Sequence, residues 1–224
     1  LVSWQADLFR GVTEAEHSFW RFGAYICMFP QITSGPIMRY EDAREGLMGE
    51  RISPEQFEEG LRLLVLGLAA KVLLADRLGI LWNDIQTIGF ESISTPLAWL
   101  GAFAYSLQLY FDFEGYSLMA VGIGIMLGFP YVRNFDQPYS ASSVSDFWRR
   151  WHMTLGSWFR DYVYIPMGGN RRGTKRLIVN LTVVWLLTGI WHGNGLNFIV
   201  WGLAVGGIII LEKLIYGAWL KKRR

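Results

Sequence analysis

Two histidines offer the chemistry of a general base in a largely apolar sequence. His192 follows Trp191 and precedes Gly193, where one apolar segment ends and the next begins. Imidazole titrates near neutral pH and can take a proton from a reacting hydroxyl. An apolar setting disfavours the imidazolium ion, and the neighbouring glycine leaves space for a substrate. A histidine that only hydrogen-bonds an adjacent helix is equally compatible with these residues.

The second histidine, His152, lies in a segment that combines aromatic and basic side chains. Residues 143–164 read SVSDFWRRWHMTLGSWFRDYVY. Aromatic residues and leucine recur every three or four positions, which predicts a helix, and Ser143 with Asp146 resembles its N-cap pair. The composition favours an amphipathic helix in the membrane interface. The alternative is a helix that enters the protein and turns His152 towards a reaction chamber.

An acidic pair, Asp112 and Glu114, lies in the apolar middle of the sequence. Ionisable groups at membrane depth are costly and often mark a proton or ion site, but a helix break capped by the carboxylates fits equally well. Together with Lys71 and Asp76, this pair would suit an ion-coupled transporter or flippase. Such a transporter would need these charges and would tolerate loss of both histidines.

The composition places these residues in a membrane protein. Of the 224 residues, 52% are hydrophobic and 18% are charged, whereas a soluble domain carries about a quarter charged residues. The net charge of +2 gives no indication of nucleic-acid binding. The one cysteine, Cys27, is typical of a small core residue. No residues have metal-ligand spacing, and no P-loop, dinucleotide-binding or Gly-x-Ser-x-Gly motif occurs.

Several apolar stretches approach the roughly 20 residues that a membrane-spanning helix needs. Most contain charged residues, polar residues or proline, which predicts that the helices cover one another and enclose polar groups. We therefore expect one all-α domain over residues 1–224, a polytopic membrane bundle of about five or six embedded helices, some of them re-entrant or interfacial. The stretches are 19–37, 61–82, 97–111, 116–132, 177–191 and 196–216, with polar segments at 39–59, 83–96 and 134–176.

Local motifs predict how these elements begin, pack and turn. Ser53, followed by Pro54 and Gln56, predicts a helix N-terminus. Residues 165–173 predict a turn, although a Gly-Gly-Asn run can also cradle an anion. Basic residues at 171–176 and 221–224 predict two cytoplasmic segments separated by two spans. Close helix approach is expected at the Gly-x-x-x-Gly pairs Gly124/Gly128 and Gly202/Gly206.

The order of six sequence blocks resembles the membrane-bound O-acyltransferase family, and most of all its bacterial alginate O-acetyltransferase branch. The resemblance runs from Pro30 through Gly35-Pro36 to the C-terminal half of the chain. The blocks are YFDFEGYS at 110–117, NFDQPY at 134–139, DFWRRWH at 146–152, WFRDY at 158–162, IPMGGNR at 165–171 and LTGIWHG at 187–193.

The resemblance implies a helical bundle around a tunnel in the bacterial cytoplasmic membrane, crossed several times and incomplete at both ends of this sequence. The donor would be acetyl-CoA or another acyl thioester from the cytoplasmic side, with no bound cofactor. The acceptor would be a hydroxyl of an extracytoplasmic polysaccharide or of a relay protein. The implied partners are membrane lipid, an extracytoplasmic acetyltransferase and polysaccharide assembly proteins, and no nucleic acid.

The resemblance also implies roles for the two histidines. His192 corresponds to the principal catalytic residue of the family and His152 to the second. In our working mechanism, His192 takes the proton of the acceptor hydroxyl as it attacks the thioester carbonyl, and His152 orients the donor or supports the base. Asn194 is a candidate for stabilising the oxyanion because it is near in sequence. The other candidate substrate or tunnel residues are Trp148, Arg149, Trp151, Arg160, Asp161, Trp191, Asp112 and Tyr116.

Some positions depart from the alginate-type pattern. Glu114 and Leu118 stand where those enzymes often carry Ser and Asp. The D-alanyl transferases of teichoic acid synthesis share the Arg-Trp-His block but usually lack the block at 165–171. This favours acetyl transfer to a polysaccharide, with D-alanyl transfer to teichoic acid as the alternative. A non-catalytic scaffold in a polysaccharide assembly complex is a further hypothesis.

Overall fold

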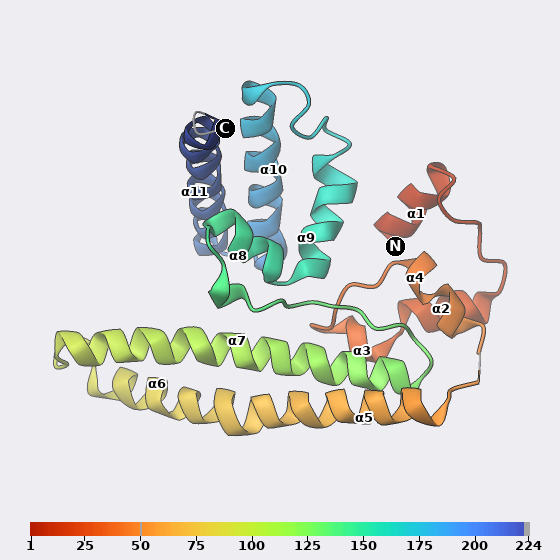
Figure 1. Cartoon of the computed structure of the whole chain (residues 1–224), viewed down its shortest axis with the longest axis horizontal. Coiled ribbons are helices and arrows are strands. Elements are labelled where there is room, and N and C mark those ends of the chain that lie inside the picture. Colours follow the sequence, from red (N-terminus) through yellow and green to blue (C-terminus); the bar gives the residue numbers. More distant parts are fainter. Residues whose placement is uncertain (50, 222–224) are drawn as a thin grey trace. The chain divides into compact units, whose positions relative to one another are not determined.

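The computed structural model describes residues 1–49 and 51–221, with side chains as far as Ile215, and all regular elements in these ranges are helical. The prediction of an all-α chain is thus confirmed. Contacts divide the chain into two compact units, Leu1–Asn134 and Phe135–Arg224 (Figure 1). Whether the units belong to one domain stays a prediction. Among the described residues, one helix is long and apolar enough to cross a membrane, at Leu196–Ile215.

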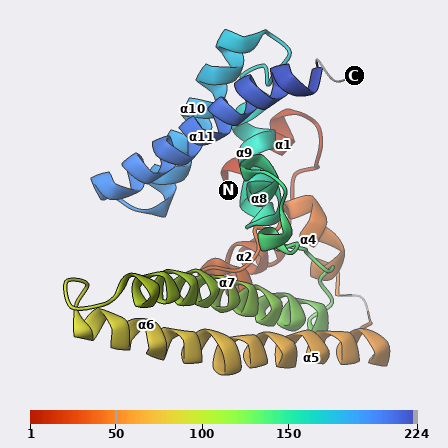
Figure 2. The ribbon, with the colours of Figure 1, turned by 60° about the vertical axis from the view of Figure 1, so that its left-hand side comes forward.

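The first unit combines short helices with a long helical hairpin. The hairpin begins as predicted, because the Gln56 backbone N–H donates to Ser53 Oγ and the Ser53 N–H donates to Gln56 Oε1. Its first arm runs beside the second in both views (Figures 1 and 2). The predicted loop at 83–96 is shorter, because helix continues to Ile88. The helices are α1 (Val2–Phe9), α2 (Phe19–Ile26), α3 (Phe29–Ile32), α4 (Tyr40–Leu47), α5 (Pro54–Ala69), the π-helix η1 (Ala70–Ala75), α6 (Asp76–Ile88) and α7 (Thr95–Met126).

Helix α7 is continuous through the acidic pair, so a helix break at Asp112 and Glu114 is wrong. Asp112 instead has a partner on the other arm, since Lys71 Nζ lies 2.7 Å from Asp112 Oδ1 and 2.7 Å from Asp76 Oδ1. The Asp112 carboxylate therefore pairs with a cation across the hairpin and does not cap a helix end. Three of the residues proposed for a transporter, Lys71, Asp76 and Asp112, thus form one ion-pair network.

Glycines let the two arms of the hairpin touch along their backbones. A Cβ atom added to Gly67 would lie 2.5 Å from the Gly115 carbonyl oxygen, and one added to Gly122 would lie 2.5 Å from that of Gly60. The expectation that helices approach closely at Gly124/Gly128 is wrong. Gly128 follows the end of α7 with φ +90, and the position of Gly124 has only an ordinary contact at 3.8 Å.

We predict different effects on stability for the same substitution at two of these glycines. Alanine normally stabilises a helix interior by roughly 0.5–1 kcal/mol relative to glycine. At Gly67 the added methyl group meets backbone of α7, so Gly67→Ala should destabilise the protein by about 1–3 kcal/mol. The matched control is Gly124→Ala, which should leave stability unchanged or higher. The measurement is thermal unfolding of both variants in detergent, and equal midpoints would contradict the packing.

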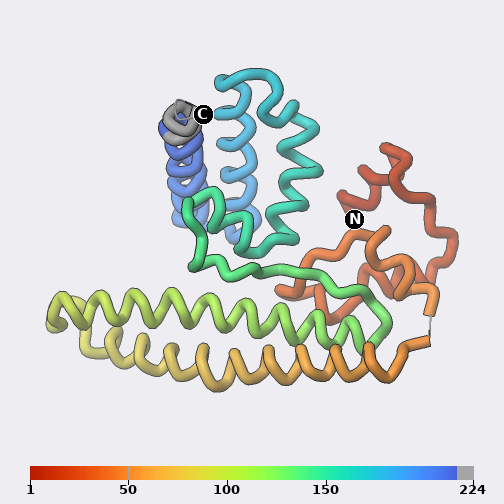
Figure 3. Tube along the Cα trace, viewed as in Figure 1, coloured from red at the N-terminus to blue at the C-terminus, as the bar shows by residue number. Residues whose placement is uncertain are grey.

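The second unit places two long helices side by side, joined by a short turn. The predicted pair Gly202/Gly206 is confirmed as a site of close approach, since a Cβ atom at Gly206 would lie 2.7 Å from Trp185 Cβ and one at Gly202 would overlap the Trp185 carbonyl oxygen. Figure 3 traces the chain through this unit. Its elements are the 3-10 helix η2 (Pro138–Ser140), α8 (Val144–Arg150), α9 (Met153–Phe159), the π-helix η3 (Arg160–Tyr164), α10 (Thr174–His192) and α11 (Leu196–Lys221).

The prediction of a single helix over 143–164 is wrong, because the helix is interrupted in the middle of this range. Its start is confirmed, because the Asp146 backbone N–H donates to Ser143 Oγ at 3.1 Å. Helix α8 then ends at Arg150, whose carbonyl oxygen accepts from the Asp136 backbone N–H at 2.9 Å. His152 adopts left-handed backbone angles, φ 45 and ψ 55, and the chain changes direction into α9. The aromatic periodicity therefore spans two helices.

The segment after η3 is a turn, as predicted. The N–H groups of Gly168 and Gly169 donate to the carbonyl oxygens of Ile165 and Tyr164, each at 2.9 Å. Because these donors are used within the turn, the anion-cradle alternative is wrong. The fully buried Asn180 of α10 holds the turn by donating to the Gly169 carbonyl oxygen at 2.8 Å. The basic residues 221–224 were used to predict a cytoplasmic segment, and residues 222–224 lie outside the described residues.

Candidate active site

The end of α10 presents His192 against α11. A glycine pair allows this approach, because a Cβ atom added to Gly202 would lie 3.1 Å from Gly189 Cα, three residues before His192. The ring centroids of His192 and Trp201 are 4.9 Å apart, with an edge-to-face angle of 81°. The close helix packing thus sets the imidazole of His192 on an aromatic wall supplied by α11.

Trp191 joins the two histidines into one site. Its ring centroid lies 4.9 Å from that of His192 and 5.9 Å from that of His152. The two imidazoles come from segments forty residues apart in sequence, the end of α10 and the turn between α8 and α9. The structure therefore brings together the two residues that we predicted to be catalytic.

The two histidines differ in their surroundings. His152 is buried, with 5% of its surface exposed, whereas His192 is exposed. His152 lies between two short helices, outside the one long apolar helix. Burial lowers the pKa of the His152 imidazole to about 4, and the nearby His192 contributes to this lowering. His152 is therefore neutral at physiological pH and offers one donor and one acceptor nitrogen.

A cluster of tryptophans supports the site from three helices. Trp148 of α8 lies 5.0 Å from Trp185 of α10 and 5.8 Å from Trp201 of α11, measured between ring centroids, both edge to face. Such geometry is favourable for aromatic pairs beyond the area they bury. The ring of Trp151 lies 5.1 Å from that of Phe135 and 5.6 Å from that of Phe147, measured between centroids, so this predicted tunnel residue packs in a second aromatic group.

The predicted charged residues of this unit form ion pairs. Arg149 lies 2.7 Å from the buried Asp146, which also contacts Arg150 at 3.1 Å. The Arg149 side chain is nevertheless 75% exposed. Arg160 and Asp161 pair with each other at 2.7 Å at the start of η3. Arg149 and Arg160 are thus held by carboxylates while most of their surface stays accessible.

The turn between α10 and α11 contains Asn194, which is exposed. Its role at the oxyanion stays a prediction. The expectation that Gly193 leaves space for substrate is wrong, because a Cβ atom there would lie 2.5 Å from the Phe198 ring. The absence of a side chain at Gly193 instead lets the Phe198 ring pack against the backbone directly after His192.

Asp112 and Tyr116 lie in the first unit, both on α7. Asp112 pairs with Lys71, and the Tyr116 hydroxyl is hydrogen-bonded to the Thr33 hydroxyl. Their membership of the site with the two histidines stays a prediction. Among residues 1–49 and 51–221, no three His, Cys, Asp or Glu side chains are grouped to hold a metal ion.

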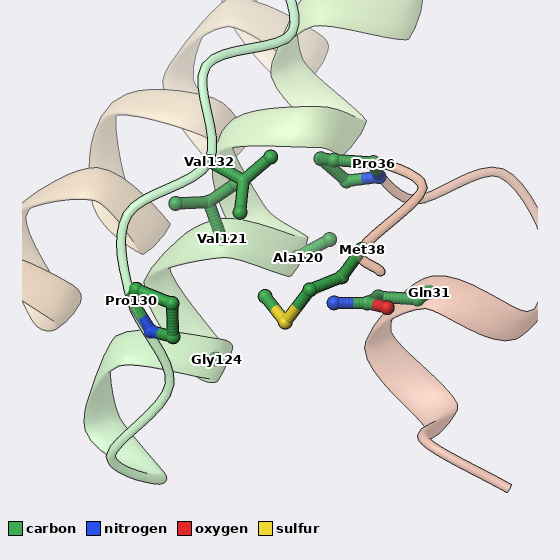
Figure 4. A pocket seen from close by; sticks show the side chains of 8 residues that line it. All are labelled: Gln31, Pro36, Met38, Ala120, Val121, Gly124, Pro130 and Val132. Carbon is green, nitrogen blue, oxygen red and sulfur yellow. The ribbon is translucent and has the colours of Figure 1, made fainter. Parts of the chain in front are cut away.

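A small pocket in the first unit offers no groups for acid–base chemistry (Figure 4). Its one polar side chain is Gln31, which faces α7 across the gap. The pocket therefore belongs to the packing of that unit. Its lining residues are Gln31, Pro36, Met38, Ala120, Val121, Gly124, Pro130 and Val132.

Sequence reasoning missed three residues around the site: Trp185, Trp201 and Glu212. The tryptophans lie in apolar runs, where composition does not distinguish a side chain facing the site from one facing lipid. The Gly202/Gly206 pair was the available signal, because it marks the side of α11 that faces α10. Glu212 was overlooked near the end of the most apolar stretch.

Comparison with known proteins gives a family model and several relatives. The model of the membrane-bound O-acyltransferase family matches residues 12–221. The chain is 41% identical to "Probable alginate O-acetylase AlgI" of Pseudomonas fluorescens over 96% of this chain and 43% of that protein. It is 39% identical to the peptidoglycan O-acetyltransferase of Helicobacter pylori over 84% of this chain and 36% of that protein. It is 30% identical to the teichoic acid D-alanyltransferase of Bacillus subtilis over 80% of this chain and 48% of that protein.

Proposed function

Because the chain belongs to the membrane-bound O-acyltransferase family, we propose that its protein transfers an acyl group, most simply acetyl, from a thioester to a hydroxyl. The chain spans about two fifths of the length of the alginate-type relatives it matches. The observation that carries the proposal is the contact of Trp191 with both His192 and His152. This contact gives a potential base and a buried neutral imidazole in one site.

The relatives support acetyl as the acyl group. Identity is 41% and 39% to relatives named for O-acetyl transfer and 30% to one named for D-alanyl transfer. The proposed acceptor is a hydroxyl of a cell-envelope polysaccharide, directly or through an extracytoplasmic acetyltransferase. The proposed donor is acetyl-CoA or another acyl thioester, and the proposed partners include polysaccharide assembly proteins.

The proposed reaction uses His192 as general base. Its neutral imidazole takes the hydroxyl proton while the acceptor oxygen attacks the thioester carbonyl carbon. The tetrahedral intermediate collapses as the carbon–sulfur bond breaks, and the imidazolium returns the proton to the leaving thiolate. Neutral His152 hydrogen-bonds the donor or orients the base, and Asn194 is the proposed donor to the oxyanion. Trp148, whose ring contacts Trp185 and Trp201, is proposed to limit access of water, which would otherwise hydrolyse the thioester.

We propose that the protein lies in the bacterial cytoplasmic membrane as a multi-pass bundle around a tunnel. The apolar helix Leu196–Ile215 supports a membrane location. Asp112 and Tyr116 of the first unit and the two histidines of the second unit remain the proposed substrate and catalytic residues of the protein. Lipid covers the outer surface, and the thioester enters from the cytoplasmic side.

The experiment that tests this function measures ester-linked acyl groups in cells. A strain that lacks the complete gene is complemented with the wild-type gene, and mild base then releases the esterified groups from purified envelope polysaccharide. We expect the wild-type gene to restore released acetate but not released D-alanine. Restoration of D-alanine alone would assign the protein to D-alanyl transfer, and restoration of neither would contradict acyl transfer to the envelope.

A further inference from the structure

One carboxylate of the long apolar helix reaches a neighbouring helix. Glu212 of α11 accepts a hydrogen bond from the Ser145 backbone N–H at 3.0 Å. Within Leu196–Ile215, only Glu212 and Lys213 are ionisable. Acidic groups in such helices are costly and are retained where they have a partner. Glu212 is partly buried and Lys213 is exposed, so Glu212 is the one that faces protein.

The bond falls at the N-terminus of α8, where backbone N–H groups lack partners within the helix. Ser143 Oγ satisfies the Asp146 N–H at 3.1 Å, and Glu212 satisfies the Ser145 N–H. An acceptor with negative charge is favoured there by hydrogen bonding and by the helix dipole. Glu212 also interacts with the Val144 N–H. The first N–H groups of α8 are thus met from two places, the local Ser143 and Glu212 on α11.

Helix α8 is short, so its position depends on few contacts. One is the Glu212 bond at its start, and another is Trp148, whose ring meets Trp201 of α11 and Trp185 of α10. The next turn of chain leads directly to His152. A shift of α8 therefore moves both Trp148 and His152 relative to His192.

We propose that Glu212 is a positioning residue that fixes α8, and through it Trp148 and His152, against the helix pair that presents His192. This inference rests on the proposed acyl transfer. The contact of Glu212 is with the backbone of α8, so it acts on the histidines through that helix. Misplacement of catalytic groups by about 1 Å can cost two orders of magnitude in rate, and loss of one of several contacts should cost less.

The test uses variants of the complete protein that remove the bond from either side. Glu212→Ala removes the acceptor, Glu212→Gln keeps an amide oxygen that can accept, and Lys213→Ala is the neighbouring control. On the other side, Ser145→Pro removes the donated N–H at a position in the first helical turn, where proline is tolerated. Ser145→Ala keeps that N–H and is its control.

We expect Glu212→Ala and Ser145→Pro each to lower kcat about tenfold, with KM for the thioester within about twofold of wild type. Glu212→Gln, Ser145→Ala and Lys213→Ala should stay within about threefold of the wild-type kcat. The double variant Glu212→Ala/Ser145→Pro should be no slower than Glu212→Ala, because Glu212→Ala already removes every hydrogen bond that this carboxylate accepts from the start of α8. Wild-type kcat in Glu212→Ala, or multiplied losses in the double variant, would overturn the proposal.

Hydrogen exchange of the peptide 143–150 in detergent gives a readout that is independent of activity. Glu212→Ala should exchange faster in this peptide than wild type, and Glu212→Gln and Lys213→Ala should match wild type. If wild-type protein transfers no acyl group, the proposed function fails, and exchange alone decides the role of Glu212. Unchanged exchange in Glu212→Ala would refute it.

Discussion

Replacing His192 by alanine is expected to reduce acyl transfer by roughly 10²- to 10⁴-fold, the usual contribution of a positioned general base. Without the imidazole, the acceptor hydroxyl must attack while it still holds its proton. The thioester should still bind, since Trp148, Trp191 and Trp201 remain. The loss should therefore lie in kcat, with KM for the donor nearly unchanged. The measurement is steady-state transfer by the complete purified protein.

The matched control is His17→Ala. His17 is an exposed histidine in the first unit to which we assign no role, so its replacement should leave kcat at the wild-type value. Both variants must be present in the membrane at wild-type abundance. Near-normal transfer by His192→Ala at that abundance would remove His192 from the mechanism.

The second large effect is expected at His152, where backbone and side chain can be tested separately. The left-handed conformation, φ 45, costs most residues about 1 kcal/mol or more, but asparagine tolerates it. His152→Asn should therefore keep the turn between α8 and α9 while removing the imidazole. We expect wild-type abundance and thermal stability with kcat lowered by about 10²-fold.

His152→Ala removes the imidazole and also places an ordinary residue in the left-handed region. Its kcat should fall at least as far as that of His152→Asn, and its unfolding midpoint should fall as well. Thermal unfolding in detergent, measured beside kcat for the same samples, separates the two effects. If His152→Asn retained wild-type kcat while His152→Ala lost only abundance, His152 would be structural.

The sequence predicted those parts of the fold that depend on neighbours in the chain. Ser53 and Gln56 form the predicted helix start because a capping box is closed within one turn. Gly202 lies at a close helix approach, as expected from its spacing with Gly206. The role of Asp112 was not predictable locally, because its partner is Lys71, forty-one residues earlier. Ion pairs between distant segments leave no periodic signal.

The candidate site was predictable in its residue types but not in its construction. His192 and His152 were singled out by their unusual settings, and the structure joins them through Trp191. The break of the aromatic helix at His152 was missed because the three- and four-residue spacing continues across it. Trp201 was missed because only the packing of α11 on α10 decides which side of an apolar helix faces the site.

The most direct test of acyl transfer at this site is a single reconstitution. Complete protein in lipid vesicles receives a thioester with a radiolabelled acetyl group and a soluble polysaccharide or hydroxyl acceptor. We expect wild-type protein to move the label into base-labile ester on the acceptor and His192→Ala, at equal protein, to leave the acceptor unlabelled. Absence of transfer by wild type, or equal transfer by both proteins, would contradict this expectation.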